Sequence, residues 1–229
     1  MNYPGFVGPS AAAQSAVANC ERAMNWYVEP QDTQTGLPTL YPTPGQQLLL
    51  TVADVGTRAL FTMNNRTFGL IGFGVYELLA GAVANKLGAV IQDGNLGYIT
   101  MNGVGGNQAG FASGGSFYSL NLATNVLSAA IIPGEATQIG MIGSTGVAFN
   151  KTIGKVRISN LNDFLTWDPT QFALRSSAPD NWTAMVVNGA DIWLIGDTSG
   201  DLWFYSGAFP FPLSPRQGVN YRFGCAATF

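Results

Sequence analysis

Short apolar runs, each broken by glycine or asparagine, recur along the chain from Gln46 onward. They are rich in β-branched, leucine and aromatic residues and are about five residues long, which is typical of β-strands. Such strands at spacings of about 8–12 residues indicate an all-β sandwich, barrel or propeller. The clearest expected strands are Leu48–Val52, Arg58–Met63, Thr67–Phe73, Ala184–Val187, Ile192–Ile195 and Leu202–Tyr205. Asn64-Asn65 and Asn188-Gly189 predict tight turns between them, because these residues tolerate positive φ.

A weak repeat favours the propeller among these folds. An aromatic residue recurs within a strand-like segment at Tyr76, Tyr118, Phe164 and Phe204, which lie 42, 46 and 40 residues apart. This spacing is close to the period of a four-stranded propeller blade, and coincidence among common aromatic residues is the alternative. We therefore expect an all-β, β-propeller-like fold with about four blade-like units. Either four blades close on themselves, or the chain is the front part of a larger propeller whose open end leaves sheet edges unpaired.

The first 45 residues differ from the rest, since they hold six of the twelve prolines. Proline fixes φ and lacks a backbone N–H, which predicts an extended arm with short strands. Asn25–Glu29 is the best strand candidate in it, and the alanine-rich segment Ser10–Ala23 is the one expected helix. The expected organisation is an extended N-terminal arm at residues 1–45 and a β-propeller-like body at residues 46–229.

The amino-acid composition excludes several classes of function. Charged residues make up 10% of the chain, against about 25% in typical soluble domains. Histidine is absent, which excludes a histidine general base, a Ser-His-Asp triad and a histidine-rich metal site. The net charge of −3 and the pI near 4.7 argue against a sequence-specific DNA reader, which usually carries a basic excess. No run of about 18 apolar residues occurs, so we expect no membrane span.

Candidate chemistry is sparse. Asp197-Thr198-Ser199-Gly200-Asp201 resembles part of a calcium loop, but further oxygen ligands are lacking and we expect the aspartates to cap their own turn. Two groups of residues are candidates for the hydrolysis or binding of sugars. The possible glycosidase carboxylates are Asp93, Asp163, Asp168 and Asp201, and the possible sugar-stacking residues, which can equally be core, are Trp167, Trp182, Trp193 and Trp203. We expect no catalysis, no cofactor and no metal, with a lectin-like carbohydrate-binding propeller as the alternative function.

Several motifs near the N-terminus occur together. They are Asn19-Cys20-Glu21-Arg22, Asn25-Trp26-Tyr27-Val28-Glu29, Leu40-Tyr41-Pro42-Thr43-Pro44-Gly45, Thr57-Arg58-Ala59-Leu60-Phe61, and Phe68-Gly69-Leu70 followed by Gly74-Val75-Tyr76. This combination resembles the tail hub family of short-tailed bacteriophages, also called packaged-DNA-stabilisation or tail accessory factors. Near the C-terminus, Leu202-Trp203-Phe204-Tyr205-Ser206-Gly207 followed by Gly224-Cys225-Ala226 resembles a mid-chain part of such proteins.

The resemblance implies a structural virion protein of the phage tail, assembled in the host cytoplasm. It implies a homo-oligomer, a sixfold ring below the portal and its adaptor that extends or closes the DNA channel and mounts fibres or spikes. The low charge is compatible with passing, non-specific contact with packaged DNA, since tight phosphate binding needs several Lys or Arg on one face. The positions expected to dock the arm on a partner are Trp26, Tyr27, Glu29, Tyr41, Pro44 and Gly45.

Overall fold

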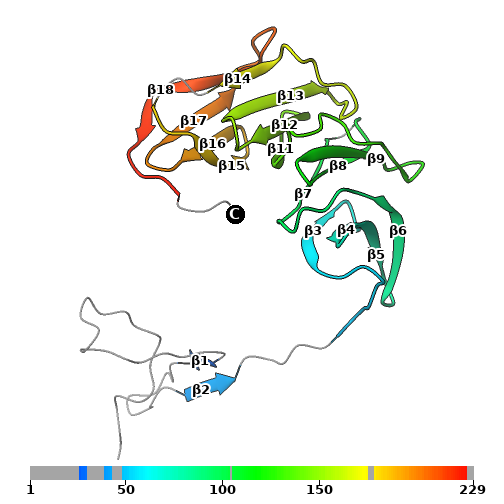
Figure 1. Cartoon of the computed structure of the whole chain (residues 1–229). Helices are drawn as coiled ribbons and strands as arrows, with labels where there is room; N and C mark the ends of the chain where they lie inside the picture. Colours follow the sequence, from blue (N-terminus) through cyan, green and yellow to red (C-terminus); the bar gives the residue numbers. More distant parts are fainter. Residues whose placement is uncertain (1–25, 30–38, 43–47, 104, 175–177, 226–229) are drawn as a thin grey trace, which may run out of the picture. The chain divides into compact units, whose positions relative to one another are not determined.

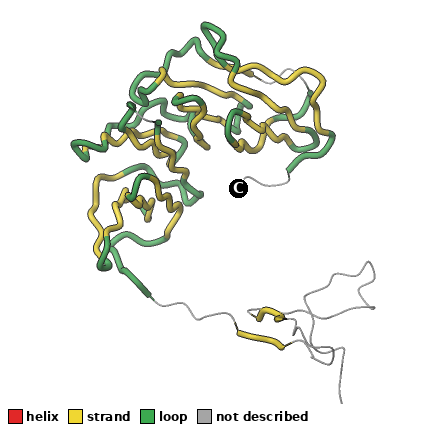
Figure 2. Tube along the Cα trace, turned by 180° about the vertical axis from the view of Figure 1, so that it is seen from behind, coloured by secondary structure: helices red, strands yellow, loops and turns green. Residues whose placement is uncertain are grey.

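The computed structural model describes residues 26–29, 39–42, 48–103, 105–174 and 178–225 (Figure 1). The chain divides into two compact units, residues 1–49 and 50–229. The described residues contain strands, turns and loops but no helix (Figure 2). The expected helix at Ser10–Ala23 and the expected boundary after Gly45 lie outside the described residues.

In the described part of the chain, no helix has the length and apolar character needed to cross a bilayer.

The first unit contains one pair of strands. β1 (Trp26–Glu29) pairs in antiparallel orientation with β2 (Thr39–Pro42), and Tyr27 lies opposite Tyr41. The strand expected at Asn25–Glu29 is therefore present from Trp26.

The second unit consists of four antiparallel sheets of four strands each. We call them blades 1 to 4 in chain order. Blade 1 contains β3 (Thr57–Met63), β4 (Arg66–Ile71), β5 (Gly74–Leu79) and β6 (Val83–Ala89). Blade 2 contains β7 (Tyr98–Met101), β8 (Gln108–Ser113), β9 (Ser116–Asn121) and β10 (Val126–Leu127). Blade 3 contains β11 (Gln138–Ile142), β12 (Thr145–Asn150), β13 (Lys155–Leu161) and β14 (Phe172–Leu174). Blade 4 contains β15 (Trp182–Asn188), β16 (Asp191–Gly196), β17 (Gly200–Tyr205) and β18 (Leu213–Tyr221). The all-β fold of blade-like units follows the expectation from the sequence.

The turns between strands agree best with what the sequence predicts. Asn64 and Asn65 link β3 to β4 with φ of 52° and 60°, as the sequence predicts. The β15–β16 hairpin also forms, but its two-residue loop is Gly189-Ala190, because Asn188 still pairs with Asp191. The strand expected at Leu48–Val52 is wrong, since these residues form no ladder. Leu48 and Leu49 are strongly exposed, so this run packs no apolar face.

Three clusters of buried residues join successive blades. The cluster between blades 1 and 2 is centred on Phe68 and Phe111, and the cluster between blades 2 and 3 on Phe117 and Phe164. The third, between blades 3 and 4, contains the fully buried Trp182. Among the described residues, no such cluster joins blade 4 back to blade 1, and the four blades follow one another along an arc (Figure 1).

The repeat is real, but its members in blades 3 and 4 differ from those expected. Counted from the turn before it, the third strand of each blade carries Tyr76, Tyr118, Arg157 and Asp201 at the equivalent position. Phe164 lies beyond the end of β13, and Phe204 lies three residues past Asp201 on the opposite face of its sheet. The aromatic spacing thus matched the blade period but marked equivalent positions only in blades 1 and 2.

The four equivalent residues make a similar kind of hydrogen bond. Each hydrogen-bonds to the chain that enters its own blade: the Tyr76 hydroxyl donates to Asp54, the Tyr118 hydroxyl accepts from Ile91 N at 3.0 Å, Arg157 donates to Glu135 at 2.6 Å, and Asp201 accepts from Trp182 Nε1 at 3.0 Å. In blades 1 to 3 the third strand therefore ties down the segment that leads into the first strand, and in blade 4 it binds Trp182, the first residue of β15 itself.

Candidate functional site

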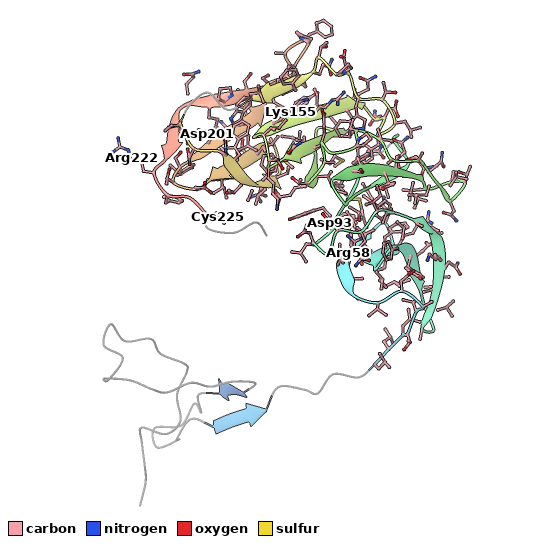
Figure 3. The ribbon with its side chains drawn as sticks, viewed as in Figure 1. Arg58, Asp93, Lys155, Asp201, Arg222 and Cys225 are labelled. Atoms are coloured by element: carbon pink, nitrogen blue, oxygen red, sulfur yellow. The ribbon has the colours of Figure 1, made fainter. Side chains whose placement is uncertain are left out.

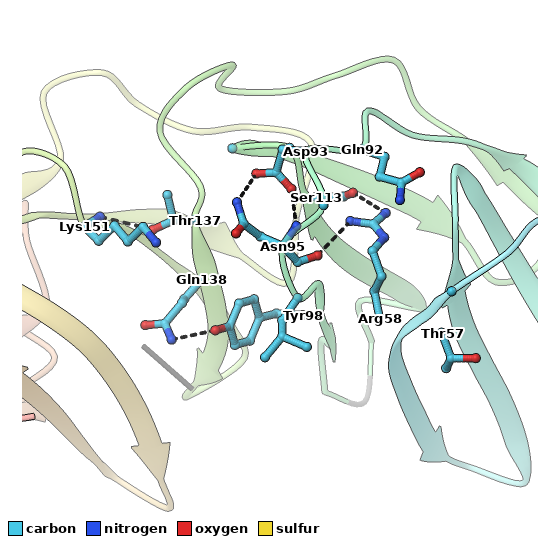
Figure 4. Close-up of a pocket in the computed structure, with 15 residues that line it drawn as sticks. Thr57, Arg58, Gln92, Asp93, Asn95, Tyr98, Ser113, Thr137, Gln138 and Lys151 are labelled. Carbon is cyan, nitrogen blue, oxygen red and sulfur yellow. Dashed lines mark hydrogen bonds between the residues drawn. The ribbon is translucent and has the colours of Figure 1, made fainter. Parts of the chain in front are cut away.

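A pocket of about 520 Å³ lies where blades 1, 2 and 3 meet (Figure 4). Its walls come from the start of β3, the connection at residues 92–96, the Gly114-Gly115 turn, the start of β11 and Lys151. This volume falls within the usual range for small-molecule sites, about 300–1,000 Å³. The pocket is thus lined by strand starts, turns and connections of successive blades.

Arg58 forms the floor of the pocket and is only 8% exposed. Its guanidinium donates to Gly72 O at 3.0 Å, Asn95 O at 3.4 Å and Ser113 Oγ at 2.7 Å, so it joins blade 1 to blade 2. Burial lowers the pKa of Arg58, and the charge of Asp93 acts against that shift. Arginine stays protonated in proteins, so the pocket holds a fixed positive charge.

Asp93 lies beside Arg58 at the pocket mouth (Figure 3, Figure 4). Its carboxylate accepts hydrogen bonds from Asn95 N at 3.1 Å and Asn95 Nδ2 at 2.9 Å. Burial alone would raise the pKa of Asp93, but these hydrogen bonds and the charge of Arg58 outweigh it and hold the pKa below its ordinary value. The pocket therefore presents one carboxylate near one guanidinium.

The opposite wall links blades 2, 3 and 4. Gln138 Nε2 donates to the Tyr98 hydroxyl at 2.8 Å, and Gln138 Oε1 accepts from Met185 N at 2.7 Å. Thr137 Oγ1 accepts from Lys151 N at 3.1 Å, which orders the Lys151 turn at the rim. This wall is held in place before any ligand binds, and such preorganisation lowers the cost of binding.

The arrangement suits the binding of a small polar molecule. It offers cationic donors in Arg58 and Lys151, an acceptor in Asp93 and the ring of Tyr98. Within the described ranges, no group of three or more His, Cys, Asp and Glu side chains could hold a metal ion.

Two sheet faces at the ends of the arc are also candidate binding surfaces. In blade 4, Ile192 and Leu194 pack toward blade 3, so the alternating Trp193 and Ile195 point the other way. In blade 1, Phe68 and Leu70 pack toward blade 2. The far side of blade 1 carries Leu60, Gly69 and Leu78 by the strand register. Figure 1 shows blades 1 and 4 as the first and last of the series.

The residues expected to dock the arm are only partly described. Trp26, Tyr27 and Glu29 lie in β1 and Tyr41 lies in β2, so the backbone pairing brings the two motif segments together. Pro44 and Gly45 lie outside the described residues. These positions belong to the first unit, whereas the pocket belongs to the second.

The four tryptophan candidates separate into core and surface. Trp182 and Trp167 are buried, and Trp203 packs against the cluster between blades 3 and 4. Trp193 lies on the outer face of blade 4, where its ring stacks on Tyr221 at a centroid distance of 5.0 Å. The core interpretation therefore fits three of them.

The candidate carboxylates each accept hydrogen bonds from other groups. Asp201 binds Trp182 inside blade 4, and Asp163 and Asp168 accept hydrogen bonds from the nearby Leu165 and Thr170. Figure 3 shows Asp93 and Asp201 in different blades. Asp180 caps the turn at residues 197–201 by accepting hydrogen bonds from Thr198 and Ser199. The expectation that Asp197 and Asp201 cap their own turn stays a prediction.

The pocket was not found from the sequence. Asp93 was singled out only as a possible glycosidase carboxylate, and Arg58 only as part of a motif. No sequence motif marks the lining residues Gln138, Tyr98 and Lys151 as part of a binding site, because they are ordinary polar residues at the start of a strand or in a turn. One usable clue was a buried-strand arginine in a chain with only ten basic residues.

The chain matches no protein-family model, and no curated protein matches it. It does resemble solved structures. One is that of Hsv2p from Kluyveromyces lactis, with 12% identity over 76% of this chain and 60% of that chain and a TM-score of 0.50. Another is a crystal structure of BBS1N in complex with ARL6DN, with 9% identity over 80% of this chain and 54% of that chain and a TM-score of 0.52. A third is the Pan2 WD40 domain of Neurospora crassa, with 11% identity over 72% and 52% and a TM-score of 0.47.

These similarities show the fold alone, that of a β-propeller. The chain spans 52% of the Pan2 domain and 54% of the BBS1N chain, about half of the length of each.

Proposed function

We propose that this protein is a structural component of a bacteriophage tail, a hub protein that assembles below the portal or adaptor and extends or closes the DNA channel. One observation carries the proposal. The strands Trp26–Glu29 and Thr39–Pro42, which overlap two motifs that resemble the tail hub family, pair in antiparallel orientation in a unit outside the propeller-like body. A small paired element on a proline-rich arm suits docking on a neighbour, because restricted chain freedom lowers the ordering cost of binding.

Composition supports the same role. Only 10% of the residues are charged, and permanent interfaces deplete charge at their cores. A net charge of −3 favours weak, passing contact with DNA over tight binding.

The test is to purify phage particles from cells in which this chain is made, count the copies of the chain per particle by quantitative mass spectrometry, and image the particles by cryo-EM. The hub proposal expects six copies around the channel axis, in contact with the portal or adaptor. Absence from purified particles would overturn it. In a reconstituted assembly, Trp26→Ala should weaken docking while leaving the melting temperature of the body unchanged, with Trp26→Phe as the matched control. Collapse of the body in Trp26→Ala would instead place Trp26 in the core.

The pocket favours a second candidate, a carbohydrate-binding propeller. Paired carboxylate, amide and guanidinium groups beside a tyrosine ring are the kinds of groups that bind sugar hydroxyls, and Asp93, Asn95, Arg58 and Tyr98 supply them. A glycan array followed by calorimetry tests this. Saturable binding that is lost in Asp93→Ala and kept in Ile153→Ala, an exposed position outside the pocket lining, supports the lectin. No binding to any glycan removes it.

A further inference from the structure

The outer face of blade 4 is an apolar surface built like the interfaces inside the molecule. Val186 and Leu202 lie on either side of Trp193 in the strand register, and Phe204 follows on the same face. Tyr221 stacks on Trp193, and Phe223 packs on Tyr221 at 5.4 Å while remaining strongly exposed. This surface is hereafter the trailing face.

The outer face of blade 1 is its counterpart, hereafter the leading face. Leu60 is 61% exposed and lies across Gly69, where an added Cβ would be 3.2 Å from Leu60 Cδ2. Ile71 and Leu78 are half-buried on the same side. Exposed apolar faces of this kind mark sites of association.

The inner blades show what such faces contact. Blade 2 packs Phe111 toward blade 1 and Phe117 toward blade 3, and blade 3 packs Ala148 toward blade 2 and Phe149 toward blade 4. In each case a trailing-type face covers a leading-type face. The chain therefore contains three examples of the contact that its own two end faces could make with each other.

Within one chain this contact is not made by the described residues, since no buried cluster joins blades 4 and 1. Propellers usually have about 4–8 blades, and two four-bladed chains would supply eight. A third copy would exceed that range. The chain also spans 54% of the BBS1N chain whose fold it resembles.

Charge does not oppose the contact. On the leading face, Lys86 pairs with Asp54 at 2.7 Å. At the trailing face, Arg216 pairs with Asp191 at 2.7 Å and lies over the Phe204 ring. Each face thus carries a locally neutralised ion pair at its edge beside an apolar centre.

We propose that two copies of this chain associate head to tail, with the trailing face of each on the leading face of the other, to close an eight-bladed ring. Head-to-tail contacts close into a ring when the rotation between copies allows it. The inference rests on the blade faces and not on the tail role. A particle without this chain would leave it intact, and six copies in a particle would be three such pairs.

The test is the mass of the purified full-length chain by size-exclusion chromatography with light scattering, over a wide range of protein concentration. The expected mass is twice that of the 24.2 kDa chain. A monomer at every concentration would overturn the proposal and would leave the end faces to other occupants, such as further blades of a longer polypeptide. Larger or open-ended assemblies would overturn closure by two copies.

Two single variants distinguish head-to-tail from face-to-same-face association. Trp193→Glu damages the trailing face and Leu60→Glu the leading face, and each should weaken pairing by about thirtyfold or more, as the loss of an interface hot spot does. Mixing the two variants should restore pairs, because one undamaged trailing face then meets one undamaged leading face. No restoration would contradict the head-to-tail geometry.

A matched control is Ile153→Glu, which changes an exposed apolar residue in the β12–β13 turn and should leave pairing unchanged. Circular dichroism and thermal melting confirm that each variant is folded. If Trp193→Glu or Leu60→Glu fails to fold, Val186→Glu and Thr62→Glu provide a second pair on the same two faces, since both side chains are exposed. Pairing that survives this second pair of substitutions would refute the assigned faces.

Discussion

Phe117→Ala should destabilise the body strongly, because this ring fills the interface between blades 2 and 3. Phe117 is fully buried and makes edge contacts with Phe164 at 5.6 Å and Trp167 at 5.0 Å. Phe→Ala in a core costs about 3–5 kcal/mol, depending on how far the site can collapse. On the neighbouring strand β8 the ring meets two small residues: Ala112 pairs with Phe117, and Gly110 lies so close that an added Cβ would be 2.6 Å from Phe117 Cζ.

Because glycine and alanine have no longer side chain that could move into the space, this strand cannot fill the cavity, and the cavity should persist. We therefore expect the upper half of the range, a loss of about 4–5 kcal/mol in the free energy of unfolding. The assay is equilibrium urea unfolding followed by tryptophan fluorescence, with Trp167 beside the substituted site as a local reporter.

The matched control is Phe73→Ala, which removes a phenylalanine that is 56% exposed in the β4–β5 turn. It should change the free energy of unfolding by no more than about 0.5 kcal/mol. If Phe117→Ala costs less than about 1.5 kcal/mol, well under the range for buried rings, the claim that this ring holds blades 2 and 3 together is refuted.

Three further predictions use the same unfolding assay. Gly110→Ala should cost about 1–3 kcal/mol by overpacking, and adding Phe117→Leu should recover part of that loss; a strictly additive double variant would contradict the contact. Burial acts to raise the pKa of Glu135, but the hydrogen bonds and charges of Arg157 and Lys155 outweigh burial and lower the pKa below its ordinary value. The stability it contributes is therefore present above its unfolded pKa and lost as pH falls through its folded pKa, and Glu135→Gln should flatten the acid limb of the stability profile; an unchanged limb would refute this. Asp180→Ala removes four hydrogen bonds that order the β16–β17 turn and should cost about 1–2 kcal/mol, whereas Asp180→Asn should cost less; equal losses would show that acceptor oxygens are not what matters.

The sequence by itself determined the strand-and-turn alternation and the number of blades. Strands and turns depend on interactions between residues that are close in the sequence. A strand alternates its side chains with a period of two, and the turn residues Asn64, Asn65 and Gly189 adopt positive φ. The run at Leu48–Val52 shows the limit of that reasoning, since an apolar pattern makes a strand only when a neighbouring strand pairs with it.

Only the tertiary structure decided which residues are equivalent and which meet. Phe164 and Arg157 both lie near the expected repeat position, and the register of β13 rather than side-chain type selects Arg157. Arg58 and Asp93 are far apart in sequence, and the pocket exists because the entry to blade 2 passes over the start of blade 1. The two exposed end faces likewise have no sequence signature. Their residues resemble those of the inner blades, and they differ only in having no adjacent blade among the described residues.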